Sequence, residues 1–354
     1  MSKAYLVLEN GKVFEGESFG AQATVTAEVV FTTGMVGYLE TLTDKSFEGQ
    51  IVCQTFPLIG NYGVISDSFE GDNIGPRGYI VKEWCQVPSN FRSEGELDTF
   101  FKARGVVGLC KIDTRALTKM LRTEGVMNGV ITADPESVDL EALKAFRETK
   151  LTEKTSAKEI TKVNEGAKYK VCLLDFGAKK SLINNITAND AEVIVCPPTI
   201  KAEEIKNLGA DAVVISDGPG NPEDNEEAIE NIKEIMALNL PIMGVCLGHQ
   251  LLALASGFKT YKLKYGHRGA NQPVKYSVTG RVMITNQNHG YAVCDESVDE
   301  NIAIKAFTNV NDKTNEGLIY KNIKALTVQF NPVVCDGPAD TSWVYTDFFK
   351  MLEK

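Results

Sequence analysis

The sequence has few histidines, and its cysteines lack the pairing that metal sites use. Only three histidines occur in 354 residues, and none of the eight cysteines belongs to a C-x-x-C pair. Closely spaced cysteine or histidine ligands are the usual sign of a zinc site or a disulfide framework. We therefore expect no metal and no cofactor in this chain. Scattered cysteines are typical of a reducing compartment, so we expect a cytoplasmic location.

Long apolar runs and an excess of basic residues are also lacking. No segment approaches the ~18 consecutive apolar residues of a membrane span, and the apolar stretch at the start is too short for a signal peptide. Acidic residues outnumber basic residues 47 to 37, which gives a net charge of −10. Because nucleic-acid-binding proteins present a basic surface, we expect neither a nucleic-acid partner nor a membrane partner.

The length and the local patterns predict two domains. At roughly 150 residues per domain, 354 residues correspond to about two. Residues 1–150 contain short β-type runs, among them a hairpin at 5–14, and two helical stretches at 96–104 and 114–122. Residues 151–168 are rich in Lys, Glu, Thr and Ser, which predicts a solvated linker.

From residue 169 to 354, strand and helix patterns alternate. Apolar runs of β-formers at 170–174, 192–196 and 212–216 are each followed by a helical pattern. Such repeats are typical of a parallel sheet covered on both faces. We therefore predict an α/β protein, in which a smaller β-rich α/β domain precedes an open parallel sheet with helices on both faces.

One cysteine stands at the turn between a predicted buried strand and a helix. The segment GVCLG, residues 244–248, places Cys246 between two glycines at this turn. This is the thiol form of a nucleophile elbow, in which flanking side chains would clash with the tight backbone. The helix N-terminus favours a thiolate, and the N–H of Leu247 points to where an oxyanion would develop. The alternative, a cysteine buried only for close packing, remains the interpretation for the other seven.

A second glycine-containing loop ends the preceding predicted strand. Residues 216–222 read SDGPGNP, at the carboxyl edge of the sheet where ligands bind in open α/β folds. Although G-P-G by itself is a common turn, next to the elbow it is a candidate substrate cradle and second oxyanion donor.

These motifs resemble those of class I, triad-type glutamine amidotransferases, most closely in VCLGHQLLALASG at 245–257. Further segments resemble the small subunit of glutamine-dependent carbamoyl phosphate synthetase: 29–63, 89–92, 113–129, 175–183, 264–274 and 285–293. The resemblance implies glutamine hydrolysis, with ammonia delivered to a large subunit that uses ATP and Mg²⁺ in arginine and pyrimidine biosynthesis.

The resemblance also implies roles for particular residues. Cys246 would be the nucleophile that forms a glutamyl thioester, and the N–H groups of Leu247 and Gly218 would bind the oxyanion. The remaining residues would hold glutamine: Ser46, Gly220, Gln250, Asn288, Gly290 and Tyr291. For His267 and His289 a structural role is favoured, and His249 would have a structural role on the elbow helix.

Near the C-terminus the sequence departs from the family pattern. The family's H-P-E motif, which supplies the catalytic base and its orienting acid, reads Asn331-Pro332-Val333 here. An amide cannot accept the thiol proton, and valine cannot orient an imidazole. Impaired glutaminase activity is therefore expected, and we favour natural divergence over an engineered or sequencing change. The alternative function is a non-catalytic partner subunit of an ammonia-dependent synthetase, while a generic flavodoxin-like binding domain is remote.

Overall fold

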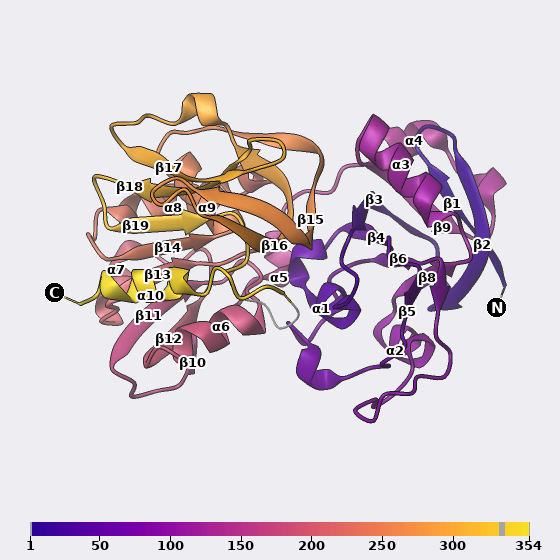
Figure 1. The fold of residues 1–354 in the computed structure, drawn as a ribbon, viewed down its shortest axis with the longest axis horizontal. Helices are drawn as coiled ribbons and strands as arrows, with labels where there is room; N and C mark the ends of the chain where they lie inside the picture. Colours follow the sequence, from indigo (N-terminus) through magenta and orange to yellow (C-terminus); the bar gives the residue numbers. More distant parts are fainter. Residues whose placement is uncertain (1, 333–336, 354) are drawn as a thin grey trace. The chain divides into compact units, whose positions relative to one another are not determined.

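The computed structural model describes residues 2–332 and 337–353 of the chain. They divide into two compact units, Met1–Glu148 and Thr149–Lys354, each with its own core (Figure 1). Within the described residues, no helix is long and apolar enough to cross a membrane. The two units are described separately below.

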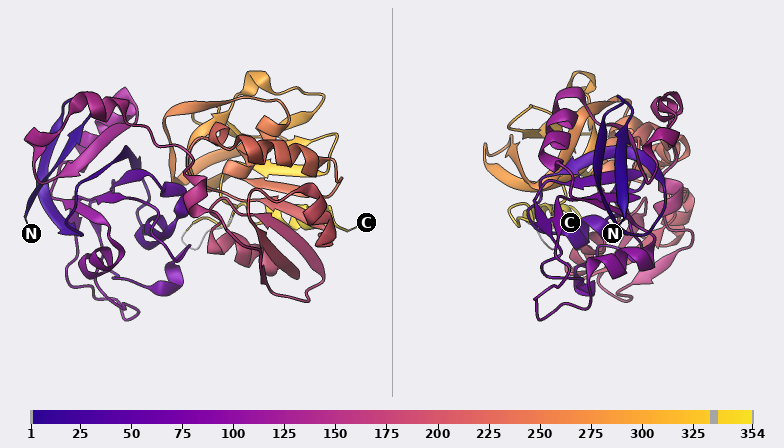
Figure 2. Two further views of the ribbon diagram at one scale, coloured as in Figure 1. Left: turned by 180° about the vertical axis from the view of Figure 1, so that it is seen from behind. Right: turned by 90° about the vertical axis from the view of Figure 1, so that its right-hand side faces the viewer.

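The first unit is built on a closed seven-stranded barrel. Its order is β1-β2-β8-β6-β4-β3-β9, with β1 and β2 joined as the expected hairpin (Figure 2). The strands are β1 (Lys3–Leu8), β2 (Val13–Gly20), β3 (Val25–Thr32), β4 (Gln50–Gln54), β6 (Gly78–Ile80), β8 (Val107–Cys110) and β9 (Met127–Thr132). The two expected helices are present as α2 (Leu97–Arg104) and α3 (Thr114–Glu124). Because the barrel is closed, none of its seven strands has an unpaired edge.

The second unit contains the predicted parallel sheet at the centre of a larger mixed sheet. The full order is β10-β12-β11-β13-β14-β19-β18-β17-β15-β16. Five neighbouring strands are parallel: β12 (Ala191–Cys196), β11 (Tyr169–Leu174), β13 (Ala212–Ile215), β14 (Ile242–Val245) and β19 (Ala325–Val328). The prediction of a parallel sheet is therefore confirmed for this core.

Antiparallel strands extend the sheet on one side, which the sequence patterns did not predict. They are β15 (Thr260–Tyr276), β16 (Val282–Val293), β17 (Ala303–Asn309) and β18 (Asn315–Tyr320). On the other edge, β10 (Thr161–Val163) pairs antiparallel with β12. The stretch at 151–168 thus contributes this strand and the short helix α5 (Thr152–Thr155) to the second unit.

Helices cover both faces of the parallel strands, and the alternation within β11 shows why. Cys172 and Leu174 pack in one core with residues of α7 (Ala202–Asn207), α8 (Glu226–Met236) and α9 (Leu247–Ala255). Val171 and Leu173 pack in the other core with residues of α6 (Lys180–Thr187) and α10 (Trp343–Lys350). Both faces of the strand are therefore apolar, as expected for a buried parallel strand.

Candidate active site around Cys246

Cys246 lies at the sharp turn between β14 and α9, in a conformation that L-residues rarely adopt. Its φ and ψ angles are 52° and −105°, and its side chain is buried. A non-glycine residue in such a region costs about 1–3 kcal/mol and persists only where its surroundings enforce it. Strained residues of this kind cluster at active sites, so the elbow geometry supports the interpretation of Cys246 as a nucleophile.

The two glycines of the elbow are required by close backbone contacts. A Cβ on Gly248 would lie 2.1 Å from the carbonyl oxygen of Ile215, and one on Gly244 would lie 2.7 Å from the carbonyl oxygen of Gly248. In addition, the N–H of Gly248 donates to the carbonyl of Ser216 at 3.0 Å. The elbow is therefore packed directly against the end of β13, where the glycine loop begins.

The glycine loop after β13 also closes on the elbow. A Cβ on Gly218 would lie 2.9 Å from Cδ2 of Leu247 and 2.8 Å from the carbonyl oxygen of Phe176. Gly220 has a φ of +88°, which favours glycine. The structure thus brings together the two residues expected to supply oxyanion donors, Gly218 and Leu247.

Other expected glutamine-binding residues meet the elbow from β16. The thiol of Cys246 lies 3.6 Å from the carbonyl oxygen of Asn288, and Nε2 of Gln250 donates to the carbonyl of Tyr291 at 2.8 Å. Gly290 lies between these two β16 residues in the chain. Ser46 belongs to the first unit, where it is buried and its N–H donates to Asp44; it is described only within that unit.

The structure reveals a further side chain against the thiol of Cys246, which the sequence patterns did not predict. Nε2 of Gln329 lies 3.6 Å from Sγ of Cys246, and its Oε1 accepts from Nε2 of Gln250 at 2.9 Å. Because Gln250 donates to Gln329, the amide of Gln329 is oriented with its N–H₂ end toward the sulfur. A polar residue directly after the apolar strand β19 was the available signal.

The structure also contains a buried ion pair that the sequence patterns did not predict. Nζ of Lys179 lies 2.9 Å from Oδ2 of Asp217, and both side chains are almost fully buried. Asp217 belongs to the glycine loop, while Lys179 directly precedes α6. The pair therefore fixes the loop near the elbow to a neighbouring element.

The residue at the expected base position does not supply a base. Asn331 is buried, and its N–H donates to the carbonyl of Asn286 at 2.9 Å in a short antiparallel bridge. Val333, at the expected orienting position, lies outside the described residues. The amide of Asn331 has no proton-accepting nitrogen, so proton transfer from Cys246 cannot take place there.

The three histidines make their hydrogen bonds away from the cysteine. Nδ1 of His249 bonds to the hydroxyl of Thr327 at 2.8 Å, and its Nε2 is buried without a partner. Burial lowers the pKa of His249 to about 3, so its ring is neutral. His249 therefore packs as a neutral ring between α9, which carries it, and Thr327 of β19.

His267 and His289 lie in a separate polar cluster on β15 and β16. Burial acts to lower the pKa of His267, but hydrogen bonds to Asp312 and Glu316 outweigh it and raise the pKa to about 9. Burial lowers the pKa of His289 well below its usual value. Among the described residues, His267, His289 and Glu316 form a group compact enough to hold a metal ion, with ligand atoms within 4.8 Å of one another.

Comparisons with known proteins cover both units. The family model "Carbamoyl-phosphate synthase small chain, CPSase domain" matches residues 6–131, and "Glutamine amidotransferase class-I" matches residues 172–351. A carbamoyl phosphate synthase small chain of Clostridium perfringens is 46% identical over 350 residues, covering 98% of this chain and 99% of the relative. A pyrimidine-specific small chain of Bacillus subtilis is 44% identical, covering 99% and 96%. Among solved structures, a putative GMP synthase protein of Thermoplasma acidophilum matches 52% of this chain and 94% of that chain, with 19% identity and a TM-score of 0.45.

Proposed function

Because the chain belongs to the family of carbamoyl phosphate synthase small chains, we propose that its second unit hydrolyses glutamine through Cys246. The ammonia would go to a separate large subunit that carries ATP and Mg²⁺, so this chain itself needs no cofactor for the reaction. The observation that carries the proposal is the strained elbow, which holds Cys246 between the oxyanion donors and the strand that bears Asn288.

The reaction starts with attack of Sγ of Cys246 on the γ-carbonyl carbon of glutamine. A negative charge develops on the carbonyl oxygen, and the N–H groups of Leu247 and Gly218 are assigned to stabilise it. Ammonia leaves as the thioester forms, and water then releases glutamate. Five residues of the second unit are assigned to the α-amino and α-carboxylate ends of glutamine: Gly220, Gln250, Asn288, Gly290 and Tyr291.

We further propose that hydrolysis is slow. A positioned general acid–base contributes roughly 10²–10⁴ in rate, and Asn331 cannot act as one. The N–H groups at the start of α9 and the amide of Gln329 favour the thiolate, so attack on glutamine remains feasible. Protonation of the departing amide nitrogen, which converts it into ammonia, and activation of water both lack their usual catalyst. The overall turnover is therefore expected far below the typical enzyme range.

A second function, a non-catalytic partner of an ammonia-dependent synthetase, is favoured specifically by Asn331. In that case the chain would bind the large subunit, and synthesis would use free ammonia. A cytoplasmic location fits both functions, since the seven cysteines among the described residues are free thiols.

The test is a steady-state assay of ammonia release from glutamine, with and without the large subunit, for wild type and Cys246→Ser. A slow release that Cys246→Ser abolishes supports the proposal. Release in neither protein, with ammonia-dependent synthesis intact, would establish the non-catalytic function. Turnover at or above ~1 s⁻¹ would refute impaired activity and require a base that the present site does not reveal.

A further inference from the structure

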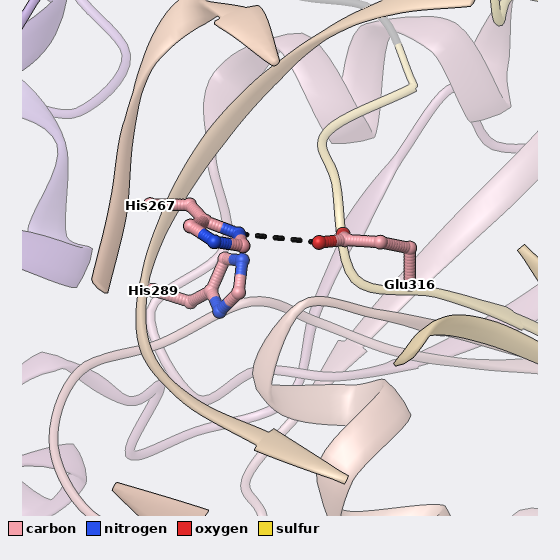
Figure 3. Close-up of side chains that lie close together, drawn as sticks. All are labelled: His267, His289 and Glu316. Atoms are coloured by element: carbon pink, nitrogen blue, oxygen red, sulfur yellow. Dashed lines mark hydrogen bonds and ion pairs between the residues drawn. The ribbon is translucent and has the colours of Figure 1, made fainter. Parts of the chain in front are cut away.

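Two histidines, a carboxylate and an amide converge in the interior of the antiparallel extension, beside the proposed active site. His267 on β15 and His289 on β16 are direct cross-strand partners, and their rings stand edge to face at 4.9 Å. Gln287 lies two residues before His289, on the same face of β16. Glu316 on β18 is fully buried and completes the group (Figure 3).

The outward-facing nitrogen of each ring is held by an acceptor. Nε2 of His267 lies 2.7 Å from Oδ2 of Asp312, and Nδ1 of His289 lies 2.7 Å from the carbonyl oxygen of Tyr291. Histidines that bind metals almost always donate their second N–H to a carboxylate or a backbone carbonyl in this way. The two acceptors therefore leave the inward-facing nitrogens, Nδ1 of His267 and Nε2 of His289, for a metal ion. Metal binding would displace the proton that the raised pKa of His267 otherwise keeps on Nδ1.

These inward-facing nitrogens meet oxygen atoms rather than donors. Nδ1 of His267 lies 2.9 Å from Oε1 of Gln287 and 3.2 Å from Oε1 of Glu316, and Nε2 of His289 lies 3.0 Å from the same Gln287 oxygen. The Gln287 amide cannot be reversed, because its Nε2 donates to Oε2 of Glu316 at 2.9 Å.

His289 thus faces an acceptor at both nitrogens, although a neutral imidazole has only one N–H. Within a buried group, one of these contacts brings two lone pairs together at hydrogen-bond distance. A cation between them converts the repulsive contact into two favourable ones. This mismatch is an observation separate from the mere proximity of the ligand types.

We propose that this group is a binding site for one divalent cation of the zinc class. The ligands are Nδ1 of His267, Nε2 of His289 and Oε1 of Glu316, with Oε1 of Gln287 as the fourth. Two nitrogen and two oxygen donors suit Zn²⁺ or Co²⁺, whereas Mg²⁺ and Ca²⁺ prefer an all-oxygen shell. Four protein ligands in a buried position correspond to a closed, structural metal site.

Charge and outer contacts agree with this assignment. Glu316 and Asp312 bring two carboxylates to the histidine pair, and a divalent cation offsets them. The ligating oxygen of Glu316 is itself held by the hydroxyl of Thr314 at 3.2 Å and by the Asn309 amide at 3.4 Å, as ligating carboxylates usually are. Arg268 is the adjacent positive charge; it follows His267 on β15, so strand alternation directs it to the opposite face, and it donates to the Tyr265 carbonyl.

The cation would fix the position of β16, the strand that carries several of the proposed glutamine-binding residues. The Tyr291 carbonyl that accepts from His289 also accepts from Gln250, and Gln250 in turn bonds to Gln329 beside Cys246. A metal that fixes His289 therefore fixes β16 relative to the elbow. Metal binding itself does not depend on whether glutamine is hydrolysed, so the two proposals fail separately.

The experiment measures metal binding by the full chain. The protein is stripped with a chelator, reconstituted with Zn²⁺ or Co²⁺, dialysed, and analysed for metal content, with Mg²⁺ as a comparison. We expect about one equivalent of Zn²⁺ per chain, a visible spectrum typical of tetrahedral Co²⁺, and no retained Mg²⁺. Glu316→Gln should remove the binding. Asp312→Asn, which changes a partly exposed side chain outside the ligand shell, should weaken it by roughly 10–100-fold.

A matched control addresses adventitious binding at the surface. The thiol of Cys294 lies 3.1 Å from a carboxylate oxygen of Glu296 in a more exposed position, which makes this pair the competing site to remove. Cys294→Ala should leave the stoichiometry and the Co²⁺ spectrum unchanged. Binding that survives Glu316→Gln, disappears with Cys294→Ala, or gives a weak octahedral Co²⁺ spectrum would overturn the assignment, as would wild-type protein that retains no metal. If Glu316→Gln fails to fold, the affinity of Asp312→Asn and the wild-type Co²⁺ spectrum decide the question.

Discussion

The strain at Cys246 predicts an unusual response to glycine. Removing Cβ at a buried position normally lowers the free energy of unfolding for two reasons. The greater conformational entropy of glycine stabilises the unfolded chain by about 0.5–1 kcal/mol, and a buried methyl group worth about 0.8 kcal/mol is lost from the folded one. At φ 52° and ψ −105°, removing Cβ also relieves about 1–3 kcal/mol of strain. We therefore expect Cys246→Gly to be about as stable as Cys246→Ala.

The matched comparison is Ala253, which is fully buried in α9, the helix that follows Cys246, and has no positive φ. In the Cys246→Ala background, Ala253→Gly should cost about 1.3–1.8 kcal/mol, because the entropy and methyl losses remain and no strain is relieved. The difference between the two alanine-to-glycine changes then isolates the strain. We expect that difference to be about 1–3 kcal/mol.

Urea unfolding measures these differences if the two units are observed separately. The chain has two tryptophans, Trp84 in the first unit and Trp343 on α10 in the second. Trp84→Phe in every variant leaves Trp343 as the fluorescence probe of the second unit. Equal m-values across the series would show that the midpoints report stability alone. An equal cost of glycine at 246 and 253 would refute the strained elbow.

Two further substitutions test proton binding and proton transfer, and a third tests the packing of the elbow. As the pH falls from about 6.5 toward 3, His249 gains a proton in the unfolded chain but not in the folded chain, so this group should lower the free energy of unfolding by about 1.4 kcal/mol per pH unit. His249→Gln should flatten that slope in acid unfolding. An unchanged slope would contradict the assignment. Asn331→His should partly restore ammonia release from glutamine, measured at steady state; no gain would mean that the site lacks more than a base. Gly248→Ala, whose Cβ would meet the Ile215 carbonyl oxygen at 2.1 Å, should destabilise the second unit by about 1–3 kcal/mol or more in the urea assay. Gly95→Ala in the first unit, with no neighbour within 4 Å, should be near neutral when urea unfolding is followed by Trp84 in a Trp343→Phe background.

The parallel core could be predicted from the sequence because its signals are local. Three of its strands, β11, β12 and β13, each contain four consecutive apolar residues, and the apolar stripe of α8 repeats at helical spacing. The antiparallel extension lacks such a signal, since β15 carries Lys262, Lys264 and other polar residues along 17 residues. Its strands are identified by their pairing with one another, which is a tertiary property. Closure of the first unit's barrel likewise depends on strand pairing that no local pattern specifies.

The candidate site likewise has a part that local sequence patterns predict and a part that depends on tertiary strand pairing. The elbow is one continuous segment, so glycine spacing alone placed Cys246 and Leu247 together. Gln329 reaches the sulfur only because β19 lies beside β14, and its role depends on the orientation that Gln250 imposes. The contact between His267 and Glu316 likewise requires the register of β15 and β18 through β17. Sequence spacing contains no information on such contacts.

The intact elbow and the altered base position point to different steps of one reaction. A strained cysteine lowers stability, and the buried side chain of Cys246 offers almost no surface to a partner, so its geometry favours chemistry at the sulfur over a purely structural role. Asn331 removes proton transfer but leaves untouched the backbone donors that we propose for the oxyanion, because these depend on Gly218 and Leu247. Nucleophilic attack and oxyanion binding can therefore persist while the later, proton-dependent steps slow down. On this basis the slow glutaminase is a stronger interpretation than the non-catalytic partner.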